Sequence, residues 1–430
     1  MNSLQKFFWR AILLFSFNAL LVACSGGGGG NLPVPDPSVL ESVSGSSGQQ
    51  LEAEDSTPLE QKLLLAVAEE IILPNYETLK EAADNFIAPN GPLETYCDLG
   101  SQALTGSSDF RDSFHELVNA VEATEMHALG PAMANGAQLR NKISSYHAGP
   151  VSNCGIDEIA VLSETAGFDL SERPANQRGM GALDYLLFNK SLLHSCPPQA
   201  STTADWNGLS ESVRFEARCT AAKLLSADLA NAASSIHNAW HTDEGDFISE
   251  FTEEATVGQN FQSLTDAMFF LEEGAKDAKL GNPLGIVAAC SSTTCPNMIQ
   301  FPHSKLSLAA VEANVIAFQS LFNVNDETGF DSVISGRGFE DVSQRFIENT
   351  QAVRTYMETI EKDLNVQVDL VESEAEAECM NAAANPDVAS EDLPACTLYG
   401  LIKRVVDDMK IDFVTILNVN LPGGTRADND

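Results

Sequence analysis

Apolar residues recur with helical spacing over most of the chain, and this periodicity constrains the fold more than any other feature. Apolar side chains return every three or four positions in residues 59–86, 225–240, 346–364 and 402–416. Such spacing places them on one face of an α-helix. The alternating pattern of a strand occurs in one short stretch, residues 366–370. The sequence therefore predicts an all-α protein built from helical bundles.

The N-terminus has the parts of a bacterial export signal. Lys6 and Arg10 form a basic start, and an apolar run from Ala11 to Ala23 follows, which is too short to span a bilayer comfortably. The small residues before Cys24 resemble a lipobox, in which the cysteine thiol carries the lipid. We therefore expect residues 1–24 to be a lipoprotein signal peptide, Cys24 to be lipidated and the membrane to be a partner through this anchor. An ordinary signal peptide is the alternative.

The segment after Cys24 is rich in Gly, Ser, Pro and acidic residues. This composition predicts a disordered tether over residues 25–57. Ser25, rather than an aspartate, follows the acylated cysteine, which by analogy favours sorting to the outer membrane. We expect a lipid-anchored protein of the cell envelope, at the outer membrane and facing the periplasm.

Two loop-like segments and one acidic insertion interrupt the helical periodicity. Residues 196–205 and 281–302 contain Cys, Pro and small polar residues, and residues 372–396 read as an acidic insertion. We expect an N-terminal helical bundle over residues 58–200 and a C-terminal helical bundle over residues 205–430.

The charge balance is strongly acidic. There are 24 Lys and Arg residues against 61 Asp and Glu residues, which gives a formal net charge of −37. Nucleic acid is excluded as a partner, because its phosphates are bound by basic surfaces. The acidity favours solubility, with attraction of cations as the alternative.

Cysteine usage indicates an oxidising compartment. Of the nine cysteines, all but Cys24 lie in the folded part of the chain, and an even number in an exported protein predicts disulfides. The sequence does not determine their connectivity, and the absence of CxxC pairs argues against a zinc site. Proximity favours the pairs Cys196–Cys219, Cys290–Cys295 and Cys379–Cys396, which leaves Cys97–Cys154.

Most enzyme signatures are absent from the sequence. It contains no phosphate-binding glycine loop and no nucleophile elbow. His115 and Glu116 begin a pattern like the zinc-protease helix, but Asn119 replaces its second histidine. His237 and His241 share a helical face, which is weak evidence for a metal site; a helix end stabilised by a cation is the alternative.

Three residues near one predicted helix end form the better candidate site. Glu122 and Glu125 are i,i+3 neighbours, and His127 follows just before Gly130. Two carboxylates and an imidazole would converge there on a metal or ligand. A solvated acidic helix end is the alternative.

The ordered segments together resemble the imelysin-like proteins of bacterial envelopes, over nearly all of residues 60–430. The stretches that carry the resemblance are residues 71–76, Glu125 with Gly130-Pro131, residues 178–188, the helix ending at Trp240, residues 282–286 and residues 428–430. The resemblance implies two helical bundles of related topology packed together. It also implies either a peptidase activity, for which the family is named, or a role in iron or metal uptake.

The central motif of that family is G-x-H-x-x-E, which sets an imidazole and a carboxylate on one site. The aligned residues here are Gly179, Gly181 and Asp184, so the histidine is missing and the carboxylate is shorter. The resemblance therefore implies an altered metal site without its nitrogen ligand. Oxygen donors from Asp184 and Glu125 would suit iron or another hard divalent cation. A purely structural or ligand-binding cleft is the alternative.

Three hypotheses for function follow. The first is a non-catalytic accessory binding lipoprotein linked to iron or metal uptake. The second is a metallopeptidase of the imelysin type, against which the missing histidine weighs, because hydrolysis needs an activated water or nucleophile. The third is an interaction module that has kept the scaffold and binds an envelope protein.

Overall fold

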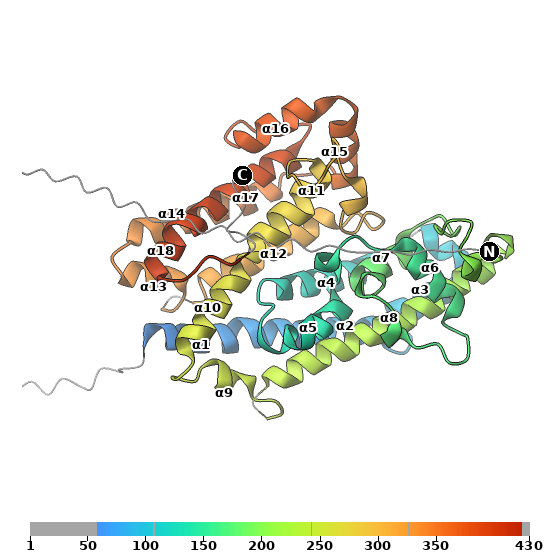
Figure 1. The fold of residues 1–430 in the computed structure, drawn as a ribbon, viewed down its shortest axis with the longest axis horizontal. Helices are drawn as coiled ribbons and strands as arrows, with labels where there is room; N and C mark the ends of the chain where they lie inside the picture. Colours follow the sequence, from blue (N-terminus) through green and yellow to red (C-terminus); the bar gives the residue numbers. More distant parts are fainter. Residues whose placement is uncertain (1–57, 106–107, 242, 326, 424–430) are drawn as a thin grey trace, which may run out of the picture. The chain divides into compact units, whose positions relative to one another are not determined.

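The computed structural model describes residues 58–105, 108–241, 243–325 and 327–423, which form helices joined by turns and by longer loops (Figure 1). The first half contains α1 (Leu59–Val67), α2 (Leu73–Ile87), α3 (Pro92–Asp98), α4 (Ser108–Glu125), α5 (Ala134–Ile143), α6 (Asn153–Leu162), α7 (Gly179–Phe188) and α8 (Glu211–Trp240). The second half contains α9 (Phe247–Phe251), α10 (Val257–Met268), α11 (Asn282–Leu284), α12 (Ser307–Phe322), α13 (Phe330–Gly336), α14 (Glu340–Met357), α15 (Leu364–Leu370), α16 (Glu376–Ala384), α17 (Pro394–Asp408) and α18 (Val414–Leu417).

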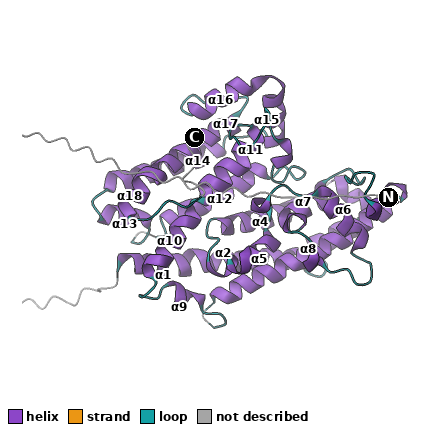
Figure 2. Cartoon of the chain, viewed as in Figure 1, coloured by secondary structure: helices purple, strands orange, loops and turns teal. Residues whose placement is uncertain are grey.

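Four π-helical segments continue these helices. They are η1 (Ala68–Ile72), η9 (Leu271–Gly281), η11 (Val371–Ala375) and η12 (Met409–Phe413). In the described ranges the one strand-like pairing is an isolated bridge between Asn323 and Gly329. The prediction of an all-α fold is confirmed (Figure 2).

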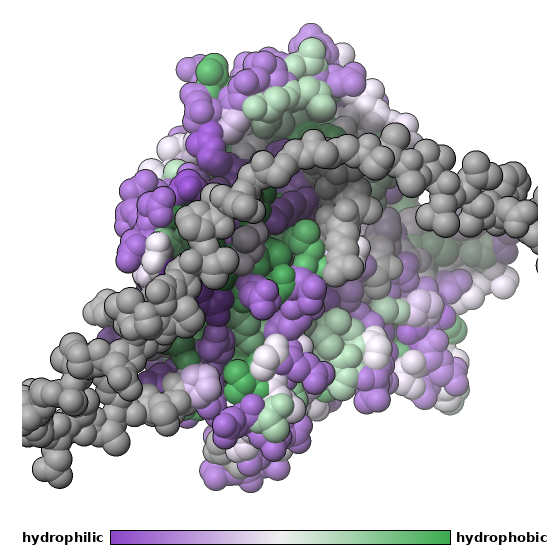
Figure 3. Space-filling model, turned by 60° about the vertical axis from the view of Figure 1, so that its left-hand side comes forward, coloured by the Kyte–Doolittle hydropathy of each residue, from purple (hydrophilic) through white to green (hydrophobic). Residues whose placement is uncertain are grey.

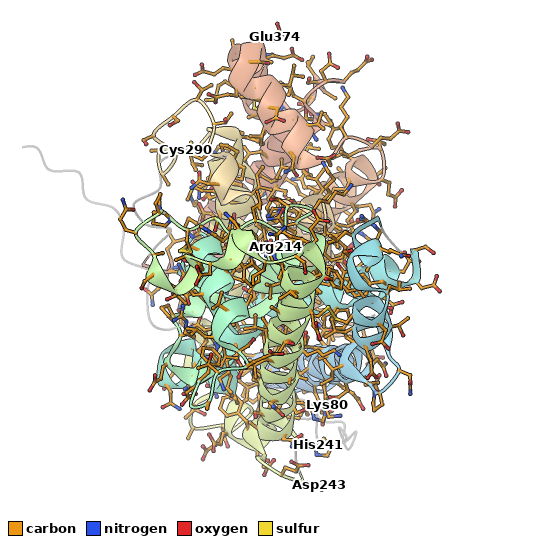
Figure 4. The ribbon with its side chains drawn as sticks, turned by 90° about the vertical axis from the view of Figure 1, so that its right-hand side faces the viewer. Lys80, Arg214, His241, Asp243, Cys290 and Glu374 are labelled. Atoms are coloured by element: carbon orange, nitrogen blue, oxygen red, sulfur yellow. A yellow bond between two sulfur atoms is a disulfide. The ribbon has the colours of Figure 1, made fainter. Side chains whose placement is uncertain are left out.

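Helices α2, α4 and α8 form the centre of the first half. Helix α2 packs against both α4 and α8, and α5 and α7 also pack on α8. The apolar stripe predicted for residues 225–240 is buried along α8. Arg214 and His241 mark the two ends of this long helix in Figure 4.

Helices α12, α14 and α17 form the centre of the second half. Helix α14 packs on α12 and α17, and η9 packs on both α12 and α17. Helix α12 also packs on α4, which joins the two sets, and the described residues form one compact unit. The division into bundles at residues 200–205 stays a prediction; α8, which lies after that boundary, packs on helices that precede it.

Pro74 distorts the first long helix without ending it. The helix runs from Leu59 through η1 to Ile87, and the π-helical turn of η1 lies directly before Pro74. Pro74 cannot donate the backbone hydrogen bond that a continuous α-helix would make there, and in the π-helical turn the preceding Leu73 N–H bonds back to the Ala68 oxygen. The apolar spacing of residues 59–86 predicts the helix but not the π-helical turn that accommodates Pro74.

Two local predictions in the second half are wrong. Residues 366–370, the one strand candidate, lie in helix α15, where Val368 packs into the core and Val366 is exposed. The apolar stripe of residues 346–364 does not form a single helix, because α14 ends at Met357 and α15 begins at Leu364. In both cases helix ends, which periodicity does not fix, decided the outcome.

Four disulfides form among the described cysteines, and two of the pairs favoured by proximity are correct. Cys290–Cys295 and Cys379–Cys396 pair as expected. The other two expectations, Cys196–Cys219 and Cys97–Cys154, are wrong, since the pairs are Cys97–Cys219 and Cys154–Cys196. The first links α3 to α8 and the second links α6 to the loop before α8, because α8 packs back on helices that precede it. Sequence separation therefore does not predict which cysteines pair when a long helix packs on helices that precede it in the chain.

The predicted signal peptide, Cys24 and the tether lie outside the described residues. Among the helices that the structure describes, none is both long and apolar enough to cross a membrane. On the face shown in Figure 3, hydrophilic residues cover much of the rim and hydrophobic residues gather toward the centre.

Candidate functional site

The C-terminal end of α4 carries two buried carboxylates. Glu122 is 0% exposed and Glu125 is 4% exposed, so the alternative of a solvated acidic helix end is wrong. Burying a carboxylate is unfavourable unless it is paired or hydrogen-bonded. The surroundings of each carboxylate therefore decide what this helix end can do.

Glu122 lies in a closed network from three other segments. It forms an ion pair with Lys279 of η9 and accepts a hydrogen bond from Gln300 Nε2 at 2.6 Å. Asn314 Nδ2 of α12 donates to the Glu122 backbone oxygen at 2.7 Å, and Lys279 Nζ also donates to Asn314 Oδ1 at 2.5 Å. Burial raises the pKa of Glu122, and the charge of Lys279 opposes this effect. The network links α4, η9 and α12, the elements through which the two halves of the fold meet.

Glu125 is held by a two-pronged contact with Arg140 of α5. Arg140 Nε and Nη2 donate to the two carboxylate oxygens at 3.3 and 2.5 Å, and His147 Nδ1 lies 4.0 Å away. Burial raises the pKa of Glu125, but the charge and hydrogen bonds of Arg140 outweigh burial and hold the pKa below its ordinary value. Burial, and then Arg140, lower the pKa of His147. Glu125 therefore remains charged beside a permanent cation.

His127 belongs to the core. It is 0% exposed, packs edge-on against Tyr76 with 5.3 Å between ring centroids, and neither ring nitrogen has a hydrogen-bond partner among the described residues. Burial lowers its pKa to about 3, so the ring is neutral. Although Glu125 is near enough to affect this pKa, His127 lines neither of the cavities described below.

The first cavity, of about 310 Å³, lies between α5, η9 and the segment that follows α5. Glu125, Arg140 and Lys279 are among its lining residues. Hydrogen bonds in a π-helix run from i to i+5, so residues five apart share a face, and η9 presents Glu273 with Ala278 and Gly274 with Lys279 to this cavity. The π-helix is therefore the element that shapes this wall.

Gly274 allows an aromatic ring to close over the basic residues. A Cβ at Gly274 would lie 2.3 Å from Phe270 Cζ, so only glycine admits the ring in this position. The Phe270 ring centroid lies 5.5 Å from Arg140 Cζ and 5.3 Å from Lys279 Nζ. These cation–π contacts add to the ion pairs that fix both cations.

The second cavity, of about 280 Å³, contains the residues that align with the family motif. Gly181, Asp184 and Tyr185 of α7 line it, together with residues 144–153 and 296–303. Gly179 begins α7 with φ 69°, and a Cβ there would lie 2.5 Å from the Ile143 oxygen, so this position requires glycine. Gly181 faces Val151, whose Cγ2 would lie 2.6 Å from a Cβ at Gly181.

Asp184 is anchored by backbone groups. It is 1% exposed and accepts hydrogen bonds from the backbone N–H groups of His303, at 3.1 Å, and Ser304, at 2.8 Å. Burial raises the pKa of Asp184 to about 6, although the hydrogen bonds from Ser304 and His303 oppose this effect. Asp184 and Glu125 line different cavities, which share a wall made of Ser144, Tyr146, Pro150 and Gln300.

An imidazole that the sequence analysis missed also lines the second cavity. The His303 ring packs against Tyr185 with 5.5 Å between centroids, and burial lowers its pKa to about 4, so it is neutral. The cavity therefore has a nitrogen donor supplied by a distant loop instead of position 181. Arg140, Lys279 and Gln300 were missed for the same reason: they reach the site from separate segments and share no spacing with Glu122 or Asp184 in the sequence.

These donor sets do not fit a bare metal ion. Glu122 is paired with Lys279 and Glu125 with Arg140, so an added cation would have to displace a buried one. Asp184 offers one carboxylate, whereas divalent ions take several anionic or neutral ligands. Across the described residues no group of three His, Cys, Asp or Glu side chains is placed to hold a metal.

The histidine pair on α8 lies away from both cavities. The His237 and His241 rings are 5.7 Å apart, at the end of the helix, and His237 Nδ1 is 3.2 Å from Asn238 Oδ1. His241 accepts a hydrogen bond from the Asp243 backbone N–H, and Figure 4 shows His241 and Asp243 together at this end. Neither histidine lines the two cavities.

The fold and site define an all-α protein with two adjacent, partly enclosed cavities, one lined by paired charges and one by a single carboxylate. The family model for imelysin (Peptidase_M75) matches residues 72–388. The chain therefore belongs to the imelysin family, which confirms the resemblance found in the sequence.

Solved structures of similar fold carry related names. One is an imelysin-like protein from Psychrobacter arcticum 273-4, with a TM-score of 0.60 and 15% identity, covering 85% of this chain and 98% of the other. Another, from Parabacteroides distasonis ATCC 8503, is provisionally named iron-regulated protein A precursor, with a TM-score of 0.52, 14% identity, and coverage of 82% and 97%. No curated protein matches the chain. At these identities the two structures establish the fold alone.

Proposed function

We propose that this protein is a non-catalytic, envelope-anchored binding protein of the imelysin family, in which the family's metal site has been altered. One observation carries the proposal: Glu122 and Glu125, the buried carboxylates at the end of α4, are already neutralised by Lys279 and Arg140, which line the first cavity. A site for a bare ion would leave such carboxylates unpaired. The two cavities, of about 310 and 280 Å³, favour binding of a small ligand.

A link to iron or another metal remains part of the proposal. It is supported by family membership and by the provisional name of the Parabacteroides relative. Within the proposal, the chain acts as an accessory in metal uptake without holding the free ion in this cleft. Lipidation at Cys24 would keep the protein at the outer membrane, where envelope proteins are candidate partners.

Peptidase activity is not part of the proposal. Hydrolysis needs a metal-activated water or a nucleophile beside a base. Of the buried carboxylates lining the cavities, Glu125 is occupied by Arg140, and Asp184 is held by two backbone N–H groups. The neutral His303 lies beside Tyr185, and burial raises the pKa of this tyrosine to about 12, so it is a poor nucleophile near neutral pH.

Calorimetric titration of the chelator-treated, full-length protein in detergent tests the metal part of the proposal. We expect ferrous, ferric and zinc ions to give no saturable heat from the first cavity, and Glu125→Gln to leave the titration unchanged. Saturable binding that Glu125→Gln abolishes would show an intact metal site and contradict the proposal.

Incubation with an unfolded polypeptide, with and without a chelator, tests the absence of catalysis. The expected result is no cleavage above that of a buffer control. Cleavage that a chelator suppresses would establish the metallopeptidase hypothesis instead.

A further inference from the structure

Asp184 is a buried carboxylate without a counter-charge. It is 1% exposed, and its hydrogen bonds come from two backbone N–H groups, those of His303 and Ser304. No ion pair joins it to any Lys, Arg or His side chain of the described residues, whereas Glu122 and Glu125 each have one. A buried, uncompensated carboxylate is strongly unfavourable, and proteins keep such groups where a ligand completes them.

The cavity beside Asp184 offers hydrogen-bond acceptors. Gln300 is 4% exposed and lines the cavity, and its Oε1 has no hydrogen-bond partner among the described residues because its Nε2 donates to Glu122. His303 is neutral and also lines the cavity. No lining residue is Lys or Arg. A ligand with several N–H donors and one positive charge would therefore complement this wall.

Much of the rest of the lining is apolar or aromatic, with Ser144, Asn153 and Asn297 as its polar members. Val151, Ile299, Phe301 and Tyr185 contribute to it, and the volume is about 280 Å³. This volume is at the small end of ligand-binding pockets, which bury most of a small molecule against apolar walls. Aromatic rings also attract organic cations through their faces. The cavity thus suits a small cation with an apolar body.

We propose that the cavity lined by Asp184, Gln300 and His303 binds a small organic monocation, a primary ammonium with a short apolar body. Asp184 balances its charge, and Gln300 Oε1 and the His303 imidazole accept its N–H groups. This inference rests on the proposed function and names the ligand of the same cleft. A single carboxylate matches one positive charge, whereas a divalent ion would leave an excess charge in a buried site.

Calorimetry with 2-phenylethylamine as the probe tests this site. The neutral isostere 2-phenylethanol is titrated in parallel, and the full-length protein is held at about pH 8, above the value of about 6 to which burial raises the pKa of Asp184. We expect the amine to bind and the alcohol to bind at least about tenfold more weakly. This comparison needs no variant. Equal affinities for the two, or no amine binding at all, would overturn the inference.

Asp184→Asn supplies the second comparison. It keeps the shape of the side chain and removes the charge, so amine affinity should fall about tenfold or more while alcohol binding changes little. Asp369→Asn, at an exposed position of α15, is the matched control and should leave both affinities unchanged. Amine binding that survives Asp184→Asn would place the ligand elsewhere and overturn the assignment.

Titrations with choline and with zinc separate this inference from the proposed function. Weaker binding of choline than of the primary amine supports recognition through N–H donors, and tighter binding of choline overturns it. If neither amine binds and zinc also gives no heat, the ligand class is wrong but the non-metal binding function stands. If zinc binds through Asp184 and His303, both are wrong.

Discussion

The two cavities share a wall, but their buried carboxylates differ in whether a cation is paired with them. At the first, the buried lining carboxylate Glu125 pairs with Arg140, and the lining cation Lys279 pairs with the buried Glu122, while Glu273 is exposed. In the second, Asp184 has no cation and is held by hydrogen bonds from His303 and Ser304. Internal pairing makes the first cavity part of the structural framework, since its charges are already satisfied. An unpaired charge leaves the second cavity incomplete, and this difference separates a supporting network from a ligand site.

Lys279→Met should give the largest effect. It leaves Glu122, at 0% exposure, without its ion-pair partner. Removing one partner of a buried pair typically costs about 3–5 kcal/mol, because the remaining charge stays buried. We expect the free energy of unfolding, measured by urea denaturation at neutral pH, to fall by about this amount.

The double variant Glu122→Gln/Lys279→Met is the control for that prediction. With both charges removed, most of the lost stability should return, because nothing charged remains buried without a partner. If the double variant is as unstable as Lys279→Met alone, lost packing rather than the unpaired carboxylate explains the effect. The contrast between the cavities would then lose its electrostatic basis.

Asp184 should give a pH dependence of stability with an unusual sign. Burial raises its pKa from 3.8 to about 6, so the folded state holds the proton more tightly than the unfolded state does. Its stabilising contribution is therefore complete below pH 3.8 and is lost as pH rises through about 6. Relative to Asp184→Asn, wild type should lose about 2–3 kcal/mol between about pH 4 and about pH 7.

Urea unfolding of both proteins at a series of pH values measures this difference. Using the variant as reference cancels the titration of the many surface carboxylates. Burial lowers the pKa of His303 to about 4, so this imidazole makes stability rise with pH, opposite in sign to Asp184, but it is present in both proteins and cancels in their difference. A stability difference that does not vary with pH would mean that Asp184 has a cation partner after all.

Glu125 should show the opposite sign. Its pKa is held below 4.5 because Arg140 outweighs burial, so its contribution is present above 4.5 and is lost as pH falls through the folded-state pKa. Glu125→Gln should destabilise the protein by about 1–3 kcal/mol near neutral pH, since Arg140 loses a charged acceptor. The difference from wild type should shrink on acidification. Parallel slopes for the Asp184 and Glu125 variants would abolish the distinction between the cavities.

Much of the fold could be predicted because helical periodicity is local. The buried stripe on α8 and the stripe of residues 402–416 follow from spacing alone. Helix ends and long-range disulfides could not be predicted, because they depend on which helices meet in space. Cys97 pairs with Cys219 across 122 positions because α3 and α8 pack together.

The candidate site was predictable in its carboxylates but not in their partners. Glu122, Glu125 and Asp184 stood out through spacing and through the family motif, and all three are buried. Lys279 and His303 could not be identified from the sequence. Lys279 lies on a π-helix and His303 lies in a loop, so neither belongs to a regular spacing of residues. The partners, however, determine whether each carboxylate is structural or available to a ligand.

Gly181→His should give the smallest change in stability and tests whether the family motif can be restored. A side chain at this position meets Val151 Cγ2 at 2.6 Å, so the single substitution should cost about 1–2 kcal/mol by overpacking and gain no zinc affinity. Adding Val151→Ala makes room, and the new imidazole then joins Asp184 and His303 on one cavity. Calorimetry should detect zinc binding by the double variant, with Val151→Ala alone as the control. Zinc binding by Gly181→His without the second substitution would show that Val151 moves aside easily. The missing histidine, and not the packing of the cavity wall, would then be what separates this cavity from a metal site.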